Sequence, residues 1–205
     1  MLPNALLSHW QATEPQLVSL AERMGLQWQE FFSGLTPEHQ TALQTVLTLS
    51  DYVADAFPRD HEHLCHAIID GSINAQINSK KLNEWLDTLA RGAESEDDWH
   101  AALRKLRRRA MVHIIWRDAL KKASTLETTR ALSQLADVCV IRSIQFLSPL
   151  LESRHGQPVG KESGEQQHLL VIGMGKLGGW ELNLSSDIDL IFAYPESGNT
   201  TGPKV

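Results

Sequence analysis

The sequence predicts an α+β fold, in which a helical N-terminal region precedes a short run of β-strands. Residues 1–153 carry apolar side chains at the three- and four-residue spacing of amphipathic helices. Residues 168–194 instead contain two short β-type runs bounded by glycine, serine and proline. Between these regions, residues 154–167 hold three glycines and one proline, which predicts a linker. Residues 168–205 are then expected to form the first strands of a second, incomplete domain.

The helical prediction depends on capping residues as well as on periodicity. Thr36 precedes a proline and a glutamate, which is a typical helix start, and Pro58 marks the stop. Ser95 precedes acidic residues that suit the positive end of a helix dipole. The predicted helices cover residues 36–57, 95–122 and 127–152, with shorter ones over 3–24, 60–70 and 80–91. Because each apolar stripe needs a partner for burial, these helices are expected to form a bundle.

Composition excludes several classes of function. The 205 residues include 19 Lys and Arg against 25 Asp and Glu, a net charge of −6. This balance argues against coating of nucleic acid or of an anionic membrane, since both favour a basic surface. The sequence contains neither an apolar run long enough for a membrane span nor a signal peptide. Cys65 and Cys139 have no metal-binding or redox spacing and fit a reducing cytoplasm.

Residues 168–194, HLLVIGMGKLGGWELNLSSDIDLIFAY, carry the chemistry and allow two interpretations. Residues 173–178 match the G-x-G-x-x-G pattern of dinucleotide-binding folds directly after an apolar run, and Glu196 lies where a ribose-binding acid is expected. That fold needs a crossover helix between its parallel strands. Only residues 179–186 are available for this helix, and glycine, asparagine and two serines among them disfavour it. The dinucleotide interpretation also leaves the acids that follow unexplained.

The second interpretation starts from Asp187 and Asp189. In a strand, residues two apart point to the same face, so these carboxylates would project together while Ile188 and Leu190 face the core. Paired carboxylates suit Mg²⁺, which takes its remaining ligands from water and substrate phosphates. The alternative, that the acids merely face solvent on an edge strand, is adequate for Asp187 and Asp189 taken alone.

The residues before the acids favour the metal hypothesis. Gly178 and Gly179 predict a turn whose amides can approach phosphate oxygens, because no Cβ blocks the way. Ser185 and Ser186 can add hydroxyl or amide donors, and Lys176 can add a positive charge near the phosphates. A glycine-rich turn followed by D-x-D on a strand is the arrangement of polymerase-β-type nucleotidyltransferases, in which metal ions clamp the phosphates.

The residues of the motif also resemble the signature of a known family. Residues 173–179, 181–183 and 185–192 resemble the signature of the bacterial glutamine synthetase adenylyltransferases, which both attach and remove AMP. Residues 103–118 resemble that family's arginine-rich helix, and residues 50–53 resemble an earlier element. Trp180 and Leu184 depart from the signature, which is expected to have a smaller or more polar residue at the first position and an aromatic residue at the second.

The resemblance implies adenylyl removal, since a motif copy that follows only an N-terminal helical region resembles the adenylyl-removing one. Orthophosphate would attack the AMP–tyrosine bond on glutamine synthetase and release ADP, whereas the opposite reaction uses ATP. The implied cofactor is Mg²⁺, and the implied partners are glutamine synthetase and a PII-type signalling protein. The family has a third carboxylate in a later strand. Glu196 lies in a tail that is predicted to be turn-like, so the chain is expected to be a fragment that lacks this acid.

Two further features leave alternatives open. The basic run of residues 104–109 can be a solvated or ion-paired helix face, a face turned toward the nucleotide site, or a nucleic-acid patch. His61, His63 and His66 lack the spacing of a zinc motif and predict a helix-surface cluster. A rival to the catalytic hypothesis is that the chain is a non-catalytic regulatory or docking piece whose helices bind a partner.

Overall fold

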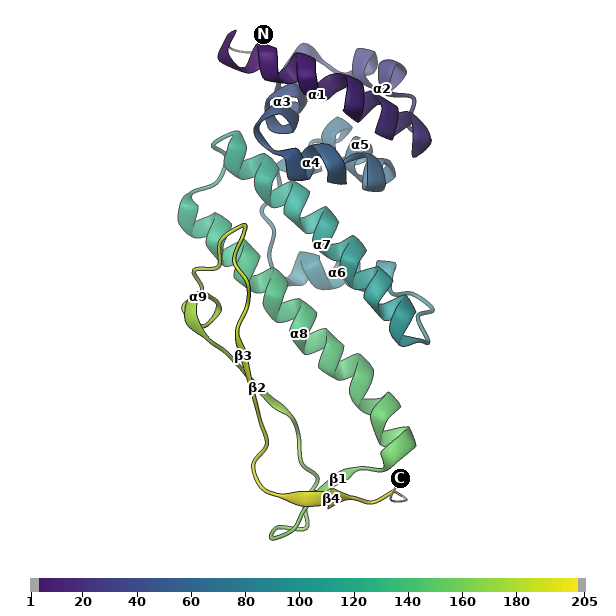
Figure 1. Ribbon diagram of the computed structural model, residues 1–205, viewed down its shortest axis with the longest axis vertical. Helices are drawn as coiled ribbons and strands as arrows, with labels where there is room; N and C mark the ends of the chain where they lie inside the picture. The colour runs from purple at the N-terminus through teal and green to yellow at the C-terminus, as the bar shows by residue number, and fades with distance from the viewer. Residues whose placement is uncertain (1–3, 203–205) are drawn as a thin grey trace.

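The computed structural model describes residues 4–202 as a mostly helical molecule with two small sheets (Figure 1). The α-helices are α1 Asn4–Arg23, α2 Trp28–Gly34, α3 Pro37–Leu49, α4 Asp51–Ala56, α5 His61–Ile69, α6 Ser79–Leu89, α7 Glu96–Ala119, α8 Thr125–His155 and α9 Gly175–Gly178. Turns of 3₁₀-helix lie at Pro58–Asp60 and Ser72–Asn74. The strands are β1 Pro158–Gly160, β2 Leu170–Gly173, β3 Leu190–Ala193 and β4 Gly198–Thr200. Predictions for residues 1–3 and 203–205 lie outside the described range. Across the described residues, no helix combines the length and apolarity needed to span a bilayer.

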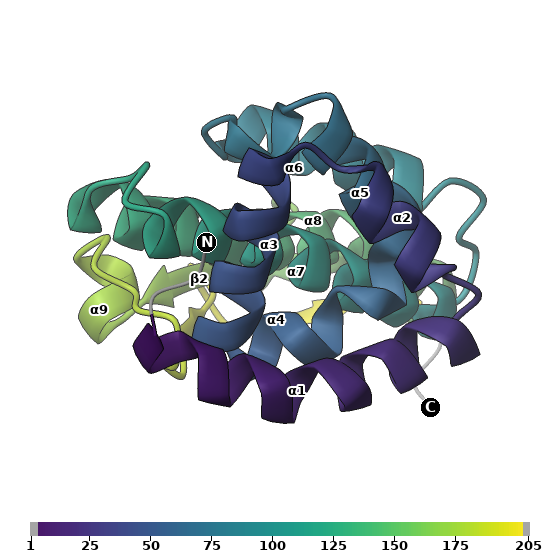
Figure 2. The ribbon, with the colours of Figure 1, turned by 90° about the horizontal axis from the view of Figure 1, so that it is seen from above.

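Two long helices, α7 and α8, organise the molecule. They run side by side in opposite directions and pack against each other and against α6 (Figure 1). The N-terminal helices α1 to α5 gather at one end, where α1 lies across α3 and α4 (Figure 2). The hairpin of β2 and β3 lies along α8, and the ribbon of β1 and β4 lies at the opposite end from α1. The predicted helical bundle is therefore confirmed.

Local capping explains most helix starts. The Thr36 hydroxyl accepts a hydrogen bond from the His39 amide at 3.2 Å. Ser95 and Asp98 form a reciprocal capping box at the start of α7, with 3.2 Å between each side-chain oxygen and the other residue's amide nitrogen. The prediction of one helix over residues 36–57 was wrong. Ser50 takes an extended conformation (φ −141°), and its hydroxyl accepts from the Val53 amide, so a second helix begins there.

The strand predictions also needed correction. The tail after Pro195 was expected to be turn-like, but β4 in that tail pairs antiparallel with β1, which lies within the predicted linker. The apolar runs form β2 and β3 as expected, although β3 begins only at Leu190 and leaves Ile188 and Asp189 outside it. The division into domains at residues 153 and 168 stays a prediction.

A continuous apolar core joins the helices. Trp28, Phe57 and Trp116 are its largest fully buried members. Trp99 of α7 stacks on Phe146 of α8, with ring centroids 4.5 Å apart. Such aromatic contacts tie distant parts of the chain together and contribute beyond the area that they bury.

A polar cluster lies within this core and joins α5, α6 and α7. The Arg109 guanidinium donates to both carboxylate oxygens of Asp60, at 2.9 and 3.0 Å. His63 and His113 face each other with 3.2 Å between their Nε2 atoms, and the Trp85 ring lies against both imidazoles. His63 therefore points inward from α5, which corrects the prediction that all three histidines of residues 61–66 lie on the helix surface.

This cluster predicts a loss of stability in mild acid. Burial, together with the nearby positive charge of Arg109, lowers the pKa of His113 to about 3 and that of His63 to about 4. The unfolded chain takes up these protons near pH 6.5, whereas the folded chain does not, so stability is full above pH 6.5 and falls as the pH drops toward 4. For His113 alone the loss of stability between pH 7.5 and pH 5 is about 2 kcal/mol.

Urea unfolding at pH 7.5 and pH 5 measures this effect. His113→Gln removes the buried titrating group and is expected to reduce the difference between the two pH values. His100→Gln, at an exposed position on α7, is the matched control and is expected to retain the full difference. Equal stability of the unsubstituted chain at both pH values would contradict the lowered pKa values of His63 and His113.

Candidate functional site

The motif region folds into a hairpin with a structured loop. β2 leads into the single turn of α9, and the chain then returns through an extended segment into β3. The two strands pair antiparallel, with Ile172 opposite Ile191 and Gly173 opposite Leu190. Because a dinucleotide-binding unit requires parallel strands joined by a crossover helix, this geometry contradicts the dinucleotide interpretation.

Three apolar side chains attach the motif loop to the helical region. Leu177 of α9 and Leu182 are buried, and Leu190 packs against the same core. The Leu182 amide also donates to the Ser133 hydroxyl of α8 at 3.3 Å. The loop that carries the candidate residues is therefore held against α8 by apolar burial and by this hydrogen bond.

The two acids lie just before β3, in an extended segment rather than in the strand as predicted. The Met174 amide donates to the Asp189 carbonyl at 2.9 Å, which continues the strand pairing by one step. Both acids are exposed, and Ile188 between them is 41% exposed instead of facing the core. Neither carboxylate makes an ion pair or hydrogen bond with another residue in the described range. Two hard oxygen ligands are thus available in this segment.

The predicted phosphate-contacting side chains come from two places, with Lys176 on α9 and Ser185 and Ser186 directly before Asp187. The Lys176 ammonium donates to the Ser186 hydroxyl at 3.4 Å, and that hydroxyl also contacts the Asn183 side chain. Ser185 is exposed beside them. The sequence motif did not identify Asn183 as part of this group, although asparagine is a common turn residue and the Ser186 amide donates to the Asn183 carbonyl at 3.2 Å.

The two glycines of the predicted phosphate turn have structural tasks. Their amides donate within α9, from Gly178 to the Met174 carbonyl and from Gly179 to the Gly175 carbonyl. A Cβ at Gly178 would lie 2.5 Å from the Gly173 carbonyl oxygen, so only glycine allows this approach of α9 to β2. A phosphate could reach either amide only by displacing these hydrogen bonds.

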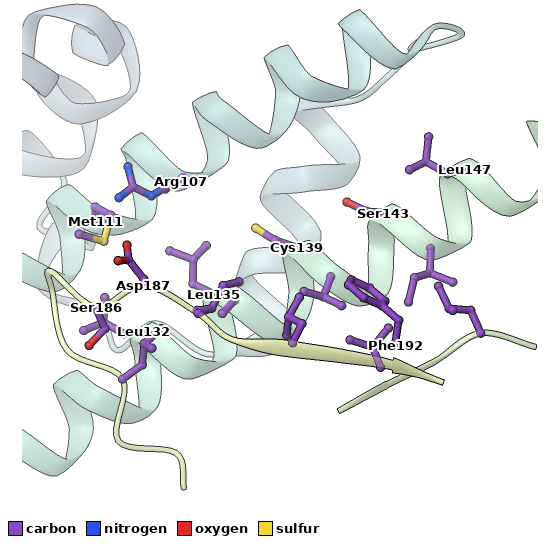
Figure 3. Close-up of a pocket in the computed structure, with 18 of the residues that line it drawn as sticks. Arg107, Met111, Leu132, Leu135, Cys139, Ser143, Leu147, Ser186, Asp187 and Phe192 are labelled. Atoms are coloured by element: carbon purple, nitrogen blue, oxygen red, sulfur yellow. The ribbon is translucent and has the colours of Figure 1, made fainter. Parts of the chain in front are cut away.

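A mostly apolar cavity of about 630 Å³ adjoins Asp187; we call it the hairpin groove (Figure 3). It lies between α8 and the β2–β3 hairpin, and α7 contributes Arg107 and Met111 at one end. Ser186 and Asp187 line this same end, whereas Asp189 does not line the groove. The groove therefore brings part of the arginine-rich helix and part of the motif together.

A third metal-binding carboxylate is missing from this neighbourhood. Among residues 4–202, no group of three His, Cys, Asp or Glu side chains is placed to hold a metal ion. Glu196 lies at the β1–β4 ribbon, where its carboxylate accepts hydrogen bonds from the amides of Glu162 and Ser163, at 2.9 and 3.2 Å. It is neither a ribose-binding acid nor a partner of Asp187.

Comparison with known proteins identifies relatives of this chain. Residues 40–204 match the model of the family described as glutamate-ammonia ligase adenylyltransferase. The chain is 40% identical over 169 residues to the bifunctional glutamine synthetase adenylyltransferase/adenylyl-removing enzyme of Pseudomonas putida, covering 82% of this chain and 17% of that protein. For the proteins of the same name from Pseudomonas aeruginosa and Shewanella loihica, identity is 42% and 38%, and the matches cover 78% and 88% of this chain. The chain spans only 16% and 19% of their lengths.

Proposed function

The chain belongs to the glutamate-ammonia ligase adenylyltransferase family, and we propose that its motif region takes part in magnesium-dependent adenylyl transfer on glutamine synthetase. The relatives are named for the attachment and for the removal of the adenylyl group. One observation carries the proposal. The Lys176 ammonium contacts the Ser186 hydroxyl, and Asp187 and Asp189, whose carboxylates have no partner among the described residues, come directly after Ser186 in the chain.

Asp187 and Asp189 are the residues that would hold Mg²⁺. This ion commonly binds one or two carboxylates and fills its other positions with water and substrate phosphate, so the donor set fits it. When bound, Mg²⁺ would neutralise phosphate charge and align the attacking and leaving oxygens. Family membership and the exposed position of both acids support this assignment.

Lys176, Ser185 and Ser186 are the proposed phosphate contacts. The Lys176 ammonium and the Ser186 hydroxyl already touch, so a positive charge and an O–H donor lie together. Charge-assisted hydrogen bonds of this kind are stronger than neutral ones. Gly178 would contribute by letting α9 approach β2, and Gly179 by adding no side chain to the loop beside a phosphate.

We propose the adenylyl-removing direction, because the motif together with the helical region before it resembles the adenylyl-removing copy of the family's motif. An orthophosphate oxygen would form a new bond to the phosphorus of the AMP–tyrosine diester while the bond from phosphorus to the tyrosine oxygen breaks. ADP leaves, and the tyrosine oxygen takes up a proton. Lys176 and Ser186 would hold the phosphate oxygens during this exchange.

A second candidate function rests on the helical region, which makes up most of the described residues. The chain would serve as a non-catalytic docking piece, with its helices binding glutamine synthetase or a PII-type signalling protein. This candidate predicts no magnesium-dependent interaction with nucleotide, whereas the catalytic proposal requires one.

Isothermal titration with ADP, in the presence and absence of Mg²⁺, separates the two candidates. The catalytic proposal predicts binding that chelation of Mg²⁺ weakens strongly and that Asp187→Asn or Asp189→Asn reduces to the level seen without metal. Asp97→Asn, at an exposed carboxylate in the first turn of α7, is the matched control and is expected to bind normally. If ADP binding is absent, or is the same with and without Mg²⁺, the docking function is favoured.

A further inference from the structure

Three consecutive arginines of α7 have different surroundings. Residues two apart on a helix are about 200° apart around its axis, so Arg107 and Arg109 face nearly opposite directions. Arg109 is buried and paired with Asp60. Arg107 is exposed and makes no ion pair with any described residue; the ring of Tyr52 lies 5.9 Å from its Cζ atom. Arg109 therefore stabilises the core, whereas the Arg107 guanidinium has no acidic partner among the described residues.

Arg107 projects toward the motif. It lines the hairpin groove together with Met111, which lies four residues later on the same face of α7. Ser186 and Asp187 line the same end of the groove, and Figure 3 shows the Asp187 carboxylate pointing toward the side from which Arg107 extends. Two positively charged side chains thus flank this segment, Arg107 from α7 and Lys176 from α9.

We propose that Arg107 is a phosphate-binding residue that the helical region contributes to the nucleotide site. This inference rests on the proposed function. A guanidinium offers a planar fork of N–H donors that matches two oxygens of one phosphate group. At this end of the groove it would hold the phosphate together with Lys176, which contacts Ser186. The helical region would then be part of the site as well as its support.

Titration with ADP and with adenosine, both in the presence of Mg²⁺, tests this role. Arg107→Gln is expected to weaken ADP binding by roughly ten- to a hundredfold, which corresponds to the loss of hydrogen bonds to a charged group. Adenosine lacks phosphates, so its affinity should stay the same. Arg107→Lys retains the charge without the fork and should restore part of the ADP affinity. A purely structural role would change both affinities together.

Arg104→Gln is the matched control, since Arg104 is exposed on the same helix one turn earlier and does not line the groove. It should change ADP affinity by about twofold or less, because solvent screens an exposed charge that makes no contact. Equal weakening by both variants would overturn the inference in favour of a general field effect. If Arg107→Gln binds ADP normally while Asp187→Asn does not, the inference fails and the proposed function stands. If the unsubstituted chain binds no ADP, both fail.

Discussion

Replacing Asp60 by asparagine is expected to lower the free energy of unfolding by about 3–5 kcal/mol, because it leaves a buried guanidinium without its counter-charge. Arg109 is only 10% exposed and donates two hydrogen bonds to Asp60, whose side chain is 3% exposed. The Trp85 ring, 5.8 Å from the Arg109 guanidinium carbon, limits the access of water to that charge. Urea unfolding at pH 7.5 measures the loss.

An exposed ion pair elsewhere in the protein provides the control. Asp55 pairs with Arg59 at 2.8 Å, but this pair is exposed, and Asp55→Asn should cost about 0.5 kcal/mol or less. The double replacement Asp60→Leu with Arg109→Met removes both charges and should cost less than Asp60→Asn alone. If Asp60→Asn is no more destabilising than Asp55→Asn, Asp60 is not needed to neutralise the buried Arg109 guanidinium.

Asp187→Asn and Asp189→Asn are each expected to reduce the release of ADP from adenylylated glutamine synthetase by at least about a hundredfold. An asparagine side chain has nearly the same shape as aspartate but no charge, so it would hold a hard divalent cation poorly. Because both side chains are exposed, neither change should lower the melting temperature. Glu94→Gln, at an exposed position outside the motif, should leave the release rate unchanged.

Local signals predicted most of the helical region. The caps at Thr36 and Ser95 were found because each depends on residues only three apart. The helix break at Ser50 follows from a signal of the same kind, which the apolar periodicity across it concealed. The pairing of β1 with β4 was missed because it joins segments about forty residues apart, and neither segment has an alternating pattern.

The candidate site was predicted in its residue types but not in its arrangement. The motif identified Asp187 and Asp189, but strand periodicity placed them inside β3 when they precede it. The basic run of α7 could not show which arginine faces the core, because that depends on Asp60 from a distant helix. Likewise His63 contacts His113, which lies fifty residues away, so no local sequence pattern could predict that His63 points inward.

Trp180 departs from the family signature and has a strained backbone conformation. The motif resemblance leads to the expectation of a smaller residue here, and Trp180 has a φ of +60°. This left-handed conformation costs a residue with a Cβ roughly 1–2 kcal/mol, whereas glycine adopts it freely. The Trp180 side chain is 45% exposed.

The fate of labelled orthophosphate tests the proposed phosphorolysis most directly. The chain is mixed with adenylylated glutamine synthetase, Mg²⁺ and labelled orthophosphate, and the nucleotide product is identified. Phosphorolysis at this site predicts ADP with the label in its β-phosphate, formed at a rate that Asp187→Asn reduces to background. Release of unlabelled AMP, equal rates with and without Asp187, or no nucleotide release at all would contradict it.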